Sequence, residues 1–327
     1  MKDENANERD AAFFEREIGS FLPDKVFDAH AHAWRRADVS MFQPPEVRNW
    51  EEYLGLMAPL HPGRRMGAYF IPGIADPPQV GAANELCAQV VASGTDTLGI
   101  HLVQPGDDPE AVRQNVKRLG LRGLKCYRTY SRSGKNDPLC SIPDMLPQEL
   151  VRVAHEEGWF ITLHVFKKRA MAEPQNIQWV KDTCQKYPDM KLILAHSARG
   201  FNPYHNLEGL PQLRHLDNLY FDTSANCEQL AHQSIIRLFG HKRLMYGTDV
   251  PISHLRGRSF AVDDSFRFVY SQTPIWDEDF DRTTQPVLIG LEHLRSLKWA
   301  CWSERLSDSQ VEDIFWNNAV ELFGLDG

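Results

Sequence analysis

The segment KVFDAHAHAWRR, residues 25–36, contains two histidines one residue apart, His30 and His32. Neutral imidazole is the commonest side-chain ligand of metal ions, and two rings at this spacing can bind the same ion. The pattern is short, and a chain with 13 histidines can contain it by chance. It indicates a metal site only if further ligands converge on the same place.

Three further candidates each follow a short apolar run. His164 follows WFITL, His196 follows KLILA, and Asp249 follows RLMYGT. A single histidine in such a position is usually a hydrogen-bonded core or loop residue and carries little weight alone. Together with His30 and His32, however, these residues supply the three or four nitrogen and oxygen ligands, and the open position, that a catalytic divalent metal requires.

These runs belong to a regular series. Eight apolar runs recur about every 31 residues, the length of one strand–helix–strand unit, and several are followed by helical patterns. The predicted strands are 26–32, 66–74, 97–103, 121–127, 159–165, 191–196, 219–223 and 244–248. The alternation predicts an α/β fold, a (β/α)8 TIM barrel. A doubly wound open sheet is the alternative, but no glycine-rich phosphate loop follows the first strand.

The remaining length fits around such a barrel. Residues 1–24 are predicted to be an N-terminal extension that contains a helix, and residues 25–325 a single domain. Long loops are expected after the first strand, at 34–65, and after the eighth, at 250–283. No linker or internal repeat indicates a second domain.

A barrel predicts where the candidate ligands lie. Active sites of this fold occur at the carboxyl ends of the strands, which is where all of the candidates fall. Because side chains alternate along a strand, His30 and His32 are expected to point into the barrel, with Asp28 on the same face but deeper. Lys125, in LRGLKCY, is expected near the rim of the fourth strand.

Composition argues against several classes of protein. A net charge of −8 disfavours general attraction to nucleic acid or to anionic membranes. No apolar run reaches the roughly 18 residues of a membrane span, and the charged N-terminus is unlike a secretory signal. Six scattered cysteines without C-x-x-C argue against a disulfide framework and for a reducing compartment. A cytoplasmic location is therefore predicted. The sequence also lacks the nucleophile-elbow motif G-x-S-x-G, which argues against a serine hydrolase of that kind.

The quoted segments resemble the amidohydrolase superfamily of metal-dependent barrels. Within it they are similar to the amidohydrolase 2 branch, which includes aminocarboxymuconate-semialdehyde decarboxylase-like enzymes. The matching segments are DAHAH (28–32), LHV (163–165), LAHS (194–197), YGTDVP (246–251) and FWNNAVELFG (315–324). The resemblance covers roughly residues 25–325. It is specific for the superfamily and not for a substrate.

The resemblance implies a role for each residue. His30, His32, His164 and Asp249 would bind one divalent metal, most often Zn²⁺, with Mn²⁺ or another divalent ion as alternatives. Asp249 and His196 would be the catalytic residues, and His196 would act as a base, polarise the substrate or bind a second metal. A second metal is the less favoured reading.

Lys125 has three readings. In binuclear relatives a lysine of the fourth strand is carbamylated and bridges two metals. The alternatives are a contact to a substrate carboxylate and an ion pair with Asp28.

Cationic residues gather just after the strand ends, and Arg128 and Arg199 lie nearest to them. They could bind an anionic substrate, because arginine grips a carboxylate at two points. The alternative is that the loop arginines pair with acids such as Asp263 and Asp264. Tyr127 and Trp34 are further candidates for substrate contact.

The sequence therefore predicts a metal-dependent hydrolase that uses metal-activated water on an ester, lactone or amide bond of a small, carboxylate-bearing substrate. The alternative is non-oxidative decarboxylation of an unsaturated or aromatic carboxylic acid. A third reading is a barrel whose metal is structural or sensory, but such a site needs no spare acid–base groups. A homo-oligomer is compatible with the sequence.

Overall fold

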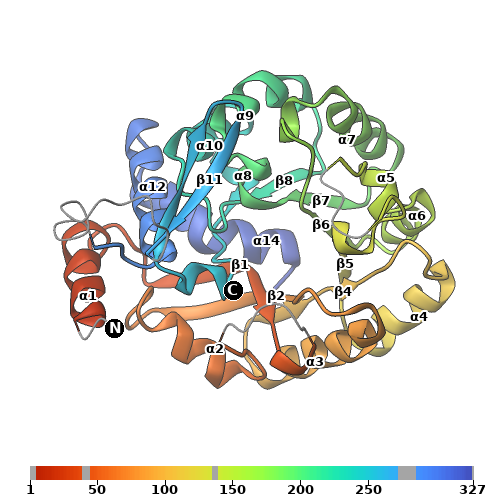
Figure 1. Cartoon of the computed structure of the whole chain (residues 1–327), viewed down its shortest axis with the longest axis horizontal. Helices are drawn as coiled ribbons and strands as arrows, with labels where there is room; N and C mark the ends of the chain where they lie inside the picture. The colour runs from red at the N-terminus through yellow and green to blue at the C-terminus, as the bar shows by residue number, and fades with distance from the viewer. Residues whose placement is uncertain (1–4, 39–44, 135–138, 272–284, 326–327) are drawn as a thin grey trace.

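The apolar runs form the parallel strands of a barrel in the computed structural model, which describes residues 5–38, 45–134, 139–271 and 285–325 (Figure 1). The barrel strands are β1 Lys25–Ala33, β2 Arg65–Pro72, β3 Thr97–Gly99, β4 His101–Leu102, β5 Gly123–Lys125, β6 Phe160–Leu163, β7 Lys191–Leu194, β8 Leu219–Asp222 and β9 Leu244–Met245. Each overlaps one of the eight predicted runs, and β3 and β4 both fall within 97–103. The predicted barrel fold is confirmed.

Backbone hydrogen bonds run around the barrel. Strands β1 to β3 pair in one parallel sheet and β4 to β9 in another, both in sequence order. The two sheets meet where Arg122, just before β5, donates its N–H to the carbonyl of Gly99 in β3 (2.8 Å). On the other side, the N–H of Asp249 donates to the carbonyl of His30 (2.8 Å). The segment after β9 therefore lies beside β1, and the strands' carboxyl ends share one rim.

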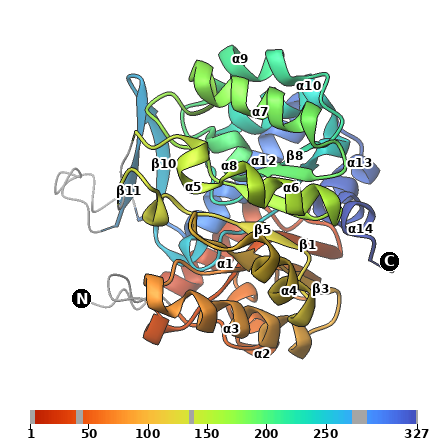
Figure 2. The ribbon, with the colours of Figure 1, turned by 90° about the vertical axis from the view of Figure 1, so that its right-hand side faces the viewer.

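Helices surround the barrel (Figures 1 and 2). They are α1 Ala6–Glu17, α2 Trp50–Met57, α3 Val80–Ser93, α4 Pro109–Arg118, α5 Ile142–Met145, α6 Gln148–Glu156, α7 Pro174–Lys186, α8 Ala195–Arg199, α9 Pro203–Gly209, α10 Gln229–Phe239, α12 Ile289–Ser303, α13 Asp308–Glu312 and α14 Asn318–Phe323. None of the helices in the described ranges has both the length and the apolar character needed to cross a membrane.

Helix α4 illustrates how the sequence sets these elements. The carboxylate of Asp108 accepts the N–H of Ala111 (2.8 Å), which satisfies a donor that the first turn leaves free. Pro109 occupies the first helical position, where its missing N–H costs nothing. Lys117 and Arg118 in the last turn face the negative end of the helix dipole.

The C-terminal helix α14 closes the amino end of the barrel. Phe323 stacks on Tyr69 of β2 with ring centroids 4.8 Å apart, and it lies 4.9 Å from Phe160 of β6 and 5.7 Å from Phe27 of β1. All four side chains are buried. These buried rings fill the amino end of the barrel, opposite to the rim that carries the candidate ligands.

The predicted loop 250–283 contains an antiparallel hairpin formed by β10 Gly257–Val262 and β11 Ser265–Tyr270. In Figure 2 the hairpin lies at one end of the molecule and α14 lies toward the other. Residues 272–283 of this loop, 39–44 of the first long loop and 1–4 of the N-terminal extension lie outside the described residues.

Helix α1 connects the hairpin to the body of the protein. The carboxylate of Asp10 accepts two hydrogen bonds from the guanidinium of Arg256, at 2.9 and 2.5 Å, and Arg256 immediately precedes β10. The ammonium of Lys298 on α12 donates to the carbonyl of Glu17 (2.5 Å). The N-terminal helix therefore binds both α12 and the root of the hairpin.

A β-bulge in β1 corrects one expectation. The register of β1 against β2 shifts between Asp28 and Ala31, and the extra residue reverses the alternation of side chains. His30 and His32 point into the barrel cavity, but Asp28 points away from it and accepts a hydrogen bond from the hydroxyl of Tyr53 on α2 (3.1 Å). The prediction that Asp28 shares the inward face was therefore wrong.

Candidate metal centre and active site

A cavity of about 500 Å³ lies at the carboxyl ends of the strands. All ten predicted site residues line it: His30, His32, Trp34, Lys125, Tyr127, Arg128, His164, His196, Arg199 and Asp249. They come from β1, from the ends of β5, β6 and β7, and from the segment after β9. Residues far apart in the sequence are brought together because parallel strands end at one rim.

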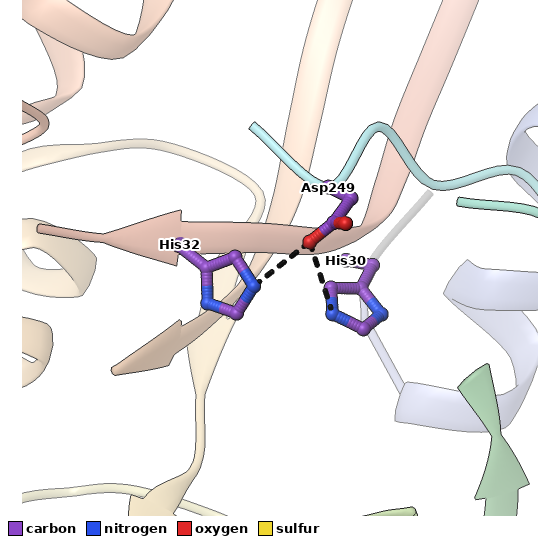
Figure 3. Close-up of side chains that lie close together, drawn as sticks. All are labelled: His30, His32 and Asp249. Carbon is purple, nitrogen blue, oxygen red and sulfur yellow. Dashed lines mark hydrogen bonds and ion pairs between the residues drawn. The ribbon is translucent and has the colours of Figure 1, made fainter. Parts of the chain in front are cut away.

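Three of these residues form a compact group at the base of the cavity. His30 and His32 come from β1, and Asp249 reaches them from the segment after β9 (Figure 3). Oδ1 of Asp249 lies 3.0 Å from Nε2 of His32 and 3.7 Å from Nε2 of His30. The three potential ligand atoms all lie within 4.8 Å of one another. This spacing suits two nitrogens and one oxygen that bind a single ion.

The first imidazole is fixed by a residue that the sequence analysis missed. Nδ1 of His30 lies 2.9 Å from Oδ2 of Asp222, the last residue of β8, and both side chains are buried. A carboxylate that accepts the Nδ1 proton leaves Nε2 with its lone pair toward Asp249, an arrangement common behind metal-binding histidines. The signal was present in the sequence, since Asp222 is an acidic residue one position before the end of the predicted strand 219–223.

Burial and charge give these groups the protonation states that metal ligands need. Burial lowers the pKa of His30 to about 4, against the opposing charge of Asp222, so the ring is neutral at pH 7. Burial would raise the pKa of Asp249, but the hydrogen bond from His32 and the neighbouring rings of His196 and His30 hold that pKa at about 2. A neutral His30 ring therefore lies beside an ionised carboxylate.

His196 lies beside this group, at the start of the turn α8. Its Nδ1 is 2.9 Å from the carbonyl oxygen of Ser224, which can only accept, so Nδ1 carries a proton and Nε2 is the ring nitrogen that takes no part in this bond. The same Nδ1 is 4.0 Å from Oδ2 of Asp249. Its ring centroid is 5.1 Å from that of His30.

His164 lines the cavity but does not belong to the compact group. Its ring lies 4.9 Å from His196 and stacks on Phe166 at 4.5 Å. Burial, together with the nearby His196 and Arg199, lowers the pKa of His164 well below its usual value. Its Nδ1 is buried and lacks a hydrogen-bond partner among the described residues. A buried polar atom without a partner costs free energy, which a bound ligand or ion would recover.

Lys125 and Tyr127 form another side of the cavity. Lys125 is buried, and burial lowers the pKa of its ammonium, which lies 5.1 Å above the ring of Tyr127. No ion pair joins Lys125 to Asp28 in the part of the chain that the structure describes, because Asp28 faces the opposite side of β1. The hydroxyl of Tyr127 lies 3.5 Å from Nδ1 of His32, at the edge of hydrogen-bond range.

Two arginines of the cavity form no ion pair with a described acidic residue. The guanidinium of Arg128 lies 5.0 Å above the ring of Phe166, and that of Arg199 lies 5.3 Å above the ring of Phe266. Arg199 also donates to the carbonyl of Lys167 (2.8 Å). Burial and the charge of Arg128 lower the pKa of Arg199 to about 10, so it remains a cation at pH 7.

Other cations near the rim are neutralised. Arg169 pairs with Glu208 and Asp264, and Lys168 pairs with Asp264. The two readings of the loop cations therefore apply to different residues. Arg169 and Lys168 contact loop acids, whereas Arg128 and Arg199 lie on aromatic rings beside the cavity.

The donor set suits a divalent cation. Imidazole nitrogens and an ionised carboxylate are ligands that zinc takes in proteins, and Asp222 accepts the Nδ1 proton of His30 behind them. The unpartnered nitrogen of His164 lies on the same cavity. These features fit the bound divalent metal that the sequence suggests.

Comparisons with known proteins agree with this architecture. A family model described as Amidohydrolase matches residues 27–325. A search of curated proteins found no match.

Several solved structures share the fold at low sequence identity. A probable 2-pyrone-4,6-dicarboxylic acid hydrolase from Acinetobacter baumannii with bound citric acid is 15% identical, with a TM-score of 0.56 over 92% of this chain and 100% of that one. An amidohydrolase from Burkholderia multivorans with bound zinc is 14% identical, with a TM-score of 0.56 over 92% and 100%. A 2,6-dihydroxybenzoate decarboxylase from Rhizobium is 14% identical, with a TM-score of 0.56 over 93% and 100%. With its family model matched along nearly the whole barrel, the chain belongs to the amidohydrolase family and is an enzyme.

Proposed function

We propose that this enzyme hydrolyses an ester, lactone or amide bond in a small carboxylate-bearing substrate, with one divalent metal, Zn²⁺ in the first instance, bound by His30, His32, Asp249 and His164. The observation that carries the proposal is the convergence of two imidazoles and an ionised carboxylate, whose potential ligand atoms lie within 4.8 Å of one another on the wall of a cavity. A divalent ion bound by these residues would supply water of lowered pKa as a nucleophile and would polarise a carbonyl.

The chain's own residues then handle protons. Asp249 is ionised and can accept a proton from attacking water, because its Oδ2 is not shared with the two β1 histidines. His196 lies on the cavity and its Nδ1 is engaged by the carbonyl of Ser224, so its Nε2 can relay a proton to the leaving group or polarise the reacting carbonyl. Lys125 is better suited to contact substrate than to bridge two metals in this one-metal proposal.

Arg128 and Arg199 would bind the carboxylate of the substrate. Both lie beside the cavity and form no ion pair with an acid in the described ranges, and their guanidinium groups lie over the rings of Phe166 and Phe266. Aromatic rings limit the directions in which the arginines can turn, which favours a two-point grip on a planar anion. Tyr127 and Trp34 would complete the wall around the substrate.

The first test is metal analysis combined with removal and reloading of the ion. Purified protein should contain one divalent ion per chain, and chelation should abolish turnover of lactones and esters with a free carboxylate. Adding Zn²⁺ or Mn²⁺ should restore turnover. A His30→Ala variant should bind the ion far more weakly. A metal-free chain with undiminished turnover would refute the proposal.

Decarboxylation is the second candidate, and the aromatic wall favours it. Trp34, Phe166 and Phe266 line the cavity and could stack on an unsaturated or aromatic acid. The metal ligands do not distinguish the two reactions, because both need an ion and a proton-transfer group. Assays of carbon dioxide release and of acid release on one panel of carboxylates and lactones would separate them. A His196→Ala variant that kept its metal and full turnover would remove the role proposed for His196 in either reaction.

A further inference from the structure

The turn that follows β7 has an unusual backbone. His196, Ser197, Ala198 and Arg199 have φ values of 57°, 51°, 59° and 55°, so four consecutive residues other than glycine are left-handed. A side chain with a Cβ is crowded in this conformation, and such residues adopt it singly far more often than in runs. The surrounding structure must therefore hold this segment in place.

Buried polar side chains from other elements supply that hold. Nδ2 of Asn226 donates to the carbonyl of His196 (2.9 Å), and Nδ2 of Asn206 on α9 donates to the carbonyl of Ser197 (2.9 Å). The hydroxyl of Ser197 lies 2.7 Å from Nδ1 of His232 on α10. Asn206, Asn226 and His232 are all fully buried. Two consecutive carbonyls of the turn thus each receive a side-chain amide.

The turn begins and ends with a cavity residue. His196 is its first residue and Arg199 its last, and both line the cavity although two residues between them do not. Immediately after it, a Cβ on Gly200 would lie 2.6 Å from Nδ2 of Asn206. The side-chain amide of Asn206 therefore packs directly against Gly200, the residue that follows the turn. If the φ angles of this turn became negative, the His196 ring and the Arg199 guanidinium would both move.

We propose that Asn226 and Asn206 are positioning residues: by binding the carbonyls of His196 and Ser197 they keep this turn left-handed and so place the His196 ring and the Arg199 guanidinium in the cavity. The proposal depends on the roles proposed above for His196 and Arg199. Asn226 acts mainly at the His196 end of the turn, and Asn206 acts one residue nearer to Arg199.

The test compares Asn226→Ala and Asn206→Ala with Asn218→Ala. Asn218 also donates its amide to backbone carbonyls, those of Cys184, Tyr187 and Met190, but none of these three residues lines the cavity. All three variants should lose stability. Asn226→Ala should lower kcat roughly 10- to 100-fold, the usual scale for a misplaced reacting group. Asn206→Ala should mainly raise KM for carboxylate substrates, and Asn218→Ala should change neither constant.

Rescue by glycine distinguishes positioning from general loss of structure. Glycine adopts the left-handed conformation without crowding. Adding Ser197→Gly and Ala198→Gly to either asparagine variant should therefore restore much of the lost kcat or KM. If Asn226→Ala and Asn206→Ala fail to fold, the same variants with Ser197→Gly and Ala198→Gly added are compared with the parent chain instead. No recovery in them, or kinetic losses no larger than those of Asn218→Ala, would overturn the proposal.

Crystal structures of the same variants give a readout that needs no substrate. The φ values of residues 196–199 should leave the left-handed region in Asn226→Ala and Asn206→Ala, while Zn²⁺ titration still gives one ion per chain. An unchanged turn would overturn the proposal even in an active enzyme. A wild-type chain inactive on every lactone, ester and carboxylate tested would instead refute the proposed function and leave the structural result standing.

Discussion

At the scale of single residues, the site depends on partners as much as on the ligands themselves. His30 is held by Asp222, His196 by the carbonyl of Ser224, and Asp249 by the ring of His32. The candidate ligands could be chosen from the sequence because each ends an apolar strand. The pairing of His30 with Asp222 could not be predicted, although Asp222 is visible as a polar residue near the end of its own strand, because a hydrogen bond between β1 and the end of β8 depends on the closed barrel. Asp28 was misplaced for a related reason, since one bulge reverses which side chains of β1 face inward.

The Asp222–His30 contact gives a prediction for metal binding. Replacing Asp222 with Asn removes the charge that orients the His30 ring, so the affinity for Zn²⁺ should fall roughly 10- to 100-fold. Competition with a fluorescent chelator measures this change. Asp313→Asn, whose carboxylate contacts His241 and Lys242, is the control and should leave the affinity unchanged. Equal affinities in the two variants would contradict the second-sphere role of Asp222.

At the scale of elements, the sequence predicted the barrel strands and missed the hairpin. The strands could be predicted because each is an apolar run before a helical pattern. The hairpin was missed because its turn lacks the usual sequence signal. Asp263 and Asp264 form the turn between β10 and β11, where Asn-Gly or Asp-Gly is the common pair. Asp263 nevertheless adopts the required left-handed conformation, with φ of 50°. The missed element matters because Phe266 of β11 lines the cavity.

The contact between Phe266 and Arg199 predicts a role for the hairpin in substrate binding. A Phe266→Ala variant should raise KM for a carboxylate substrate roughly twofold to fivefold, the worth of an exposed cation–aromatic contact, while kcat changes little. Phe260→Ala is the matched control, because Phe260 is an exposed phenylalanine on the neighbouring strand β10. Steady-state kinetics with one substrate compares the three chains. A fall in kcat alone would show that the ring acts on the chemical step instead.

At the scale of the whole molecule, several histidines outside the site are buried and neutral. Burial lowers the pKa of His61 to about 3, and those of His101 and His232 to about 4, from an ordinary value of 6.5. In the unfolded chain these rings take up a proton at about pH 6.5, whereas in the folded protein they do not. Stability is therefore unaffected by them above pH 6.5 and falls as the pH drops toward 4.

This linkage predicts the pH dependence of unfolding. Each such histidine adds up to about 1.4 kcal/mol per pH unit to the slope of unfolding free energy between pH 6.5 and 4. A His101→Gln variant should have a shallower slope in denaturant titrations across this range. His215→Gln, which changes an exposed side chain, should retain the slope of the parent. Parallel curves for the parent and His101→Gln would contradict the assignment.

The attachment of α1 has a consequence for how the chain is made. Glu17 contacts Lys298, which lies 281 residues later in the sequence. At a synthesis rate of roughly 5–20 residues per second, the first helix leaves the ribosome about 15–60 s before its binding surface exists. During translation the ring of Phe13, which in the folded protein is buried and lies 5.0 Å from the guanidinium of Arg295 on α12, has no such partner to cover it. Nascent chains of this enzyme should therefore present an early site for chaperones, and release of that site would coincide with the emergence of α12.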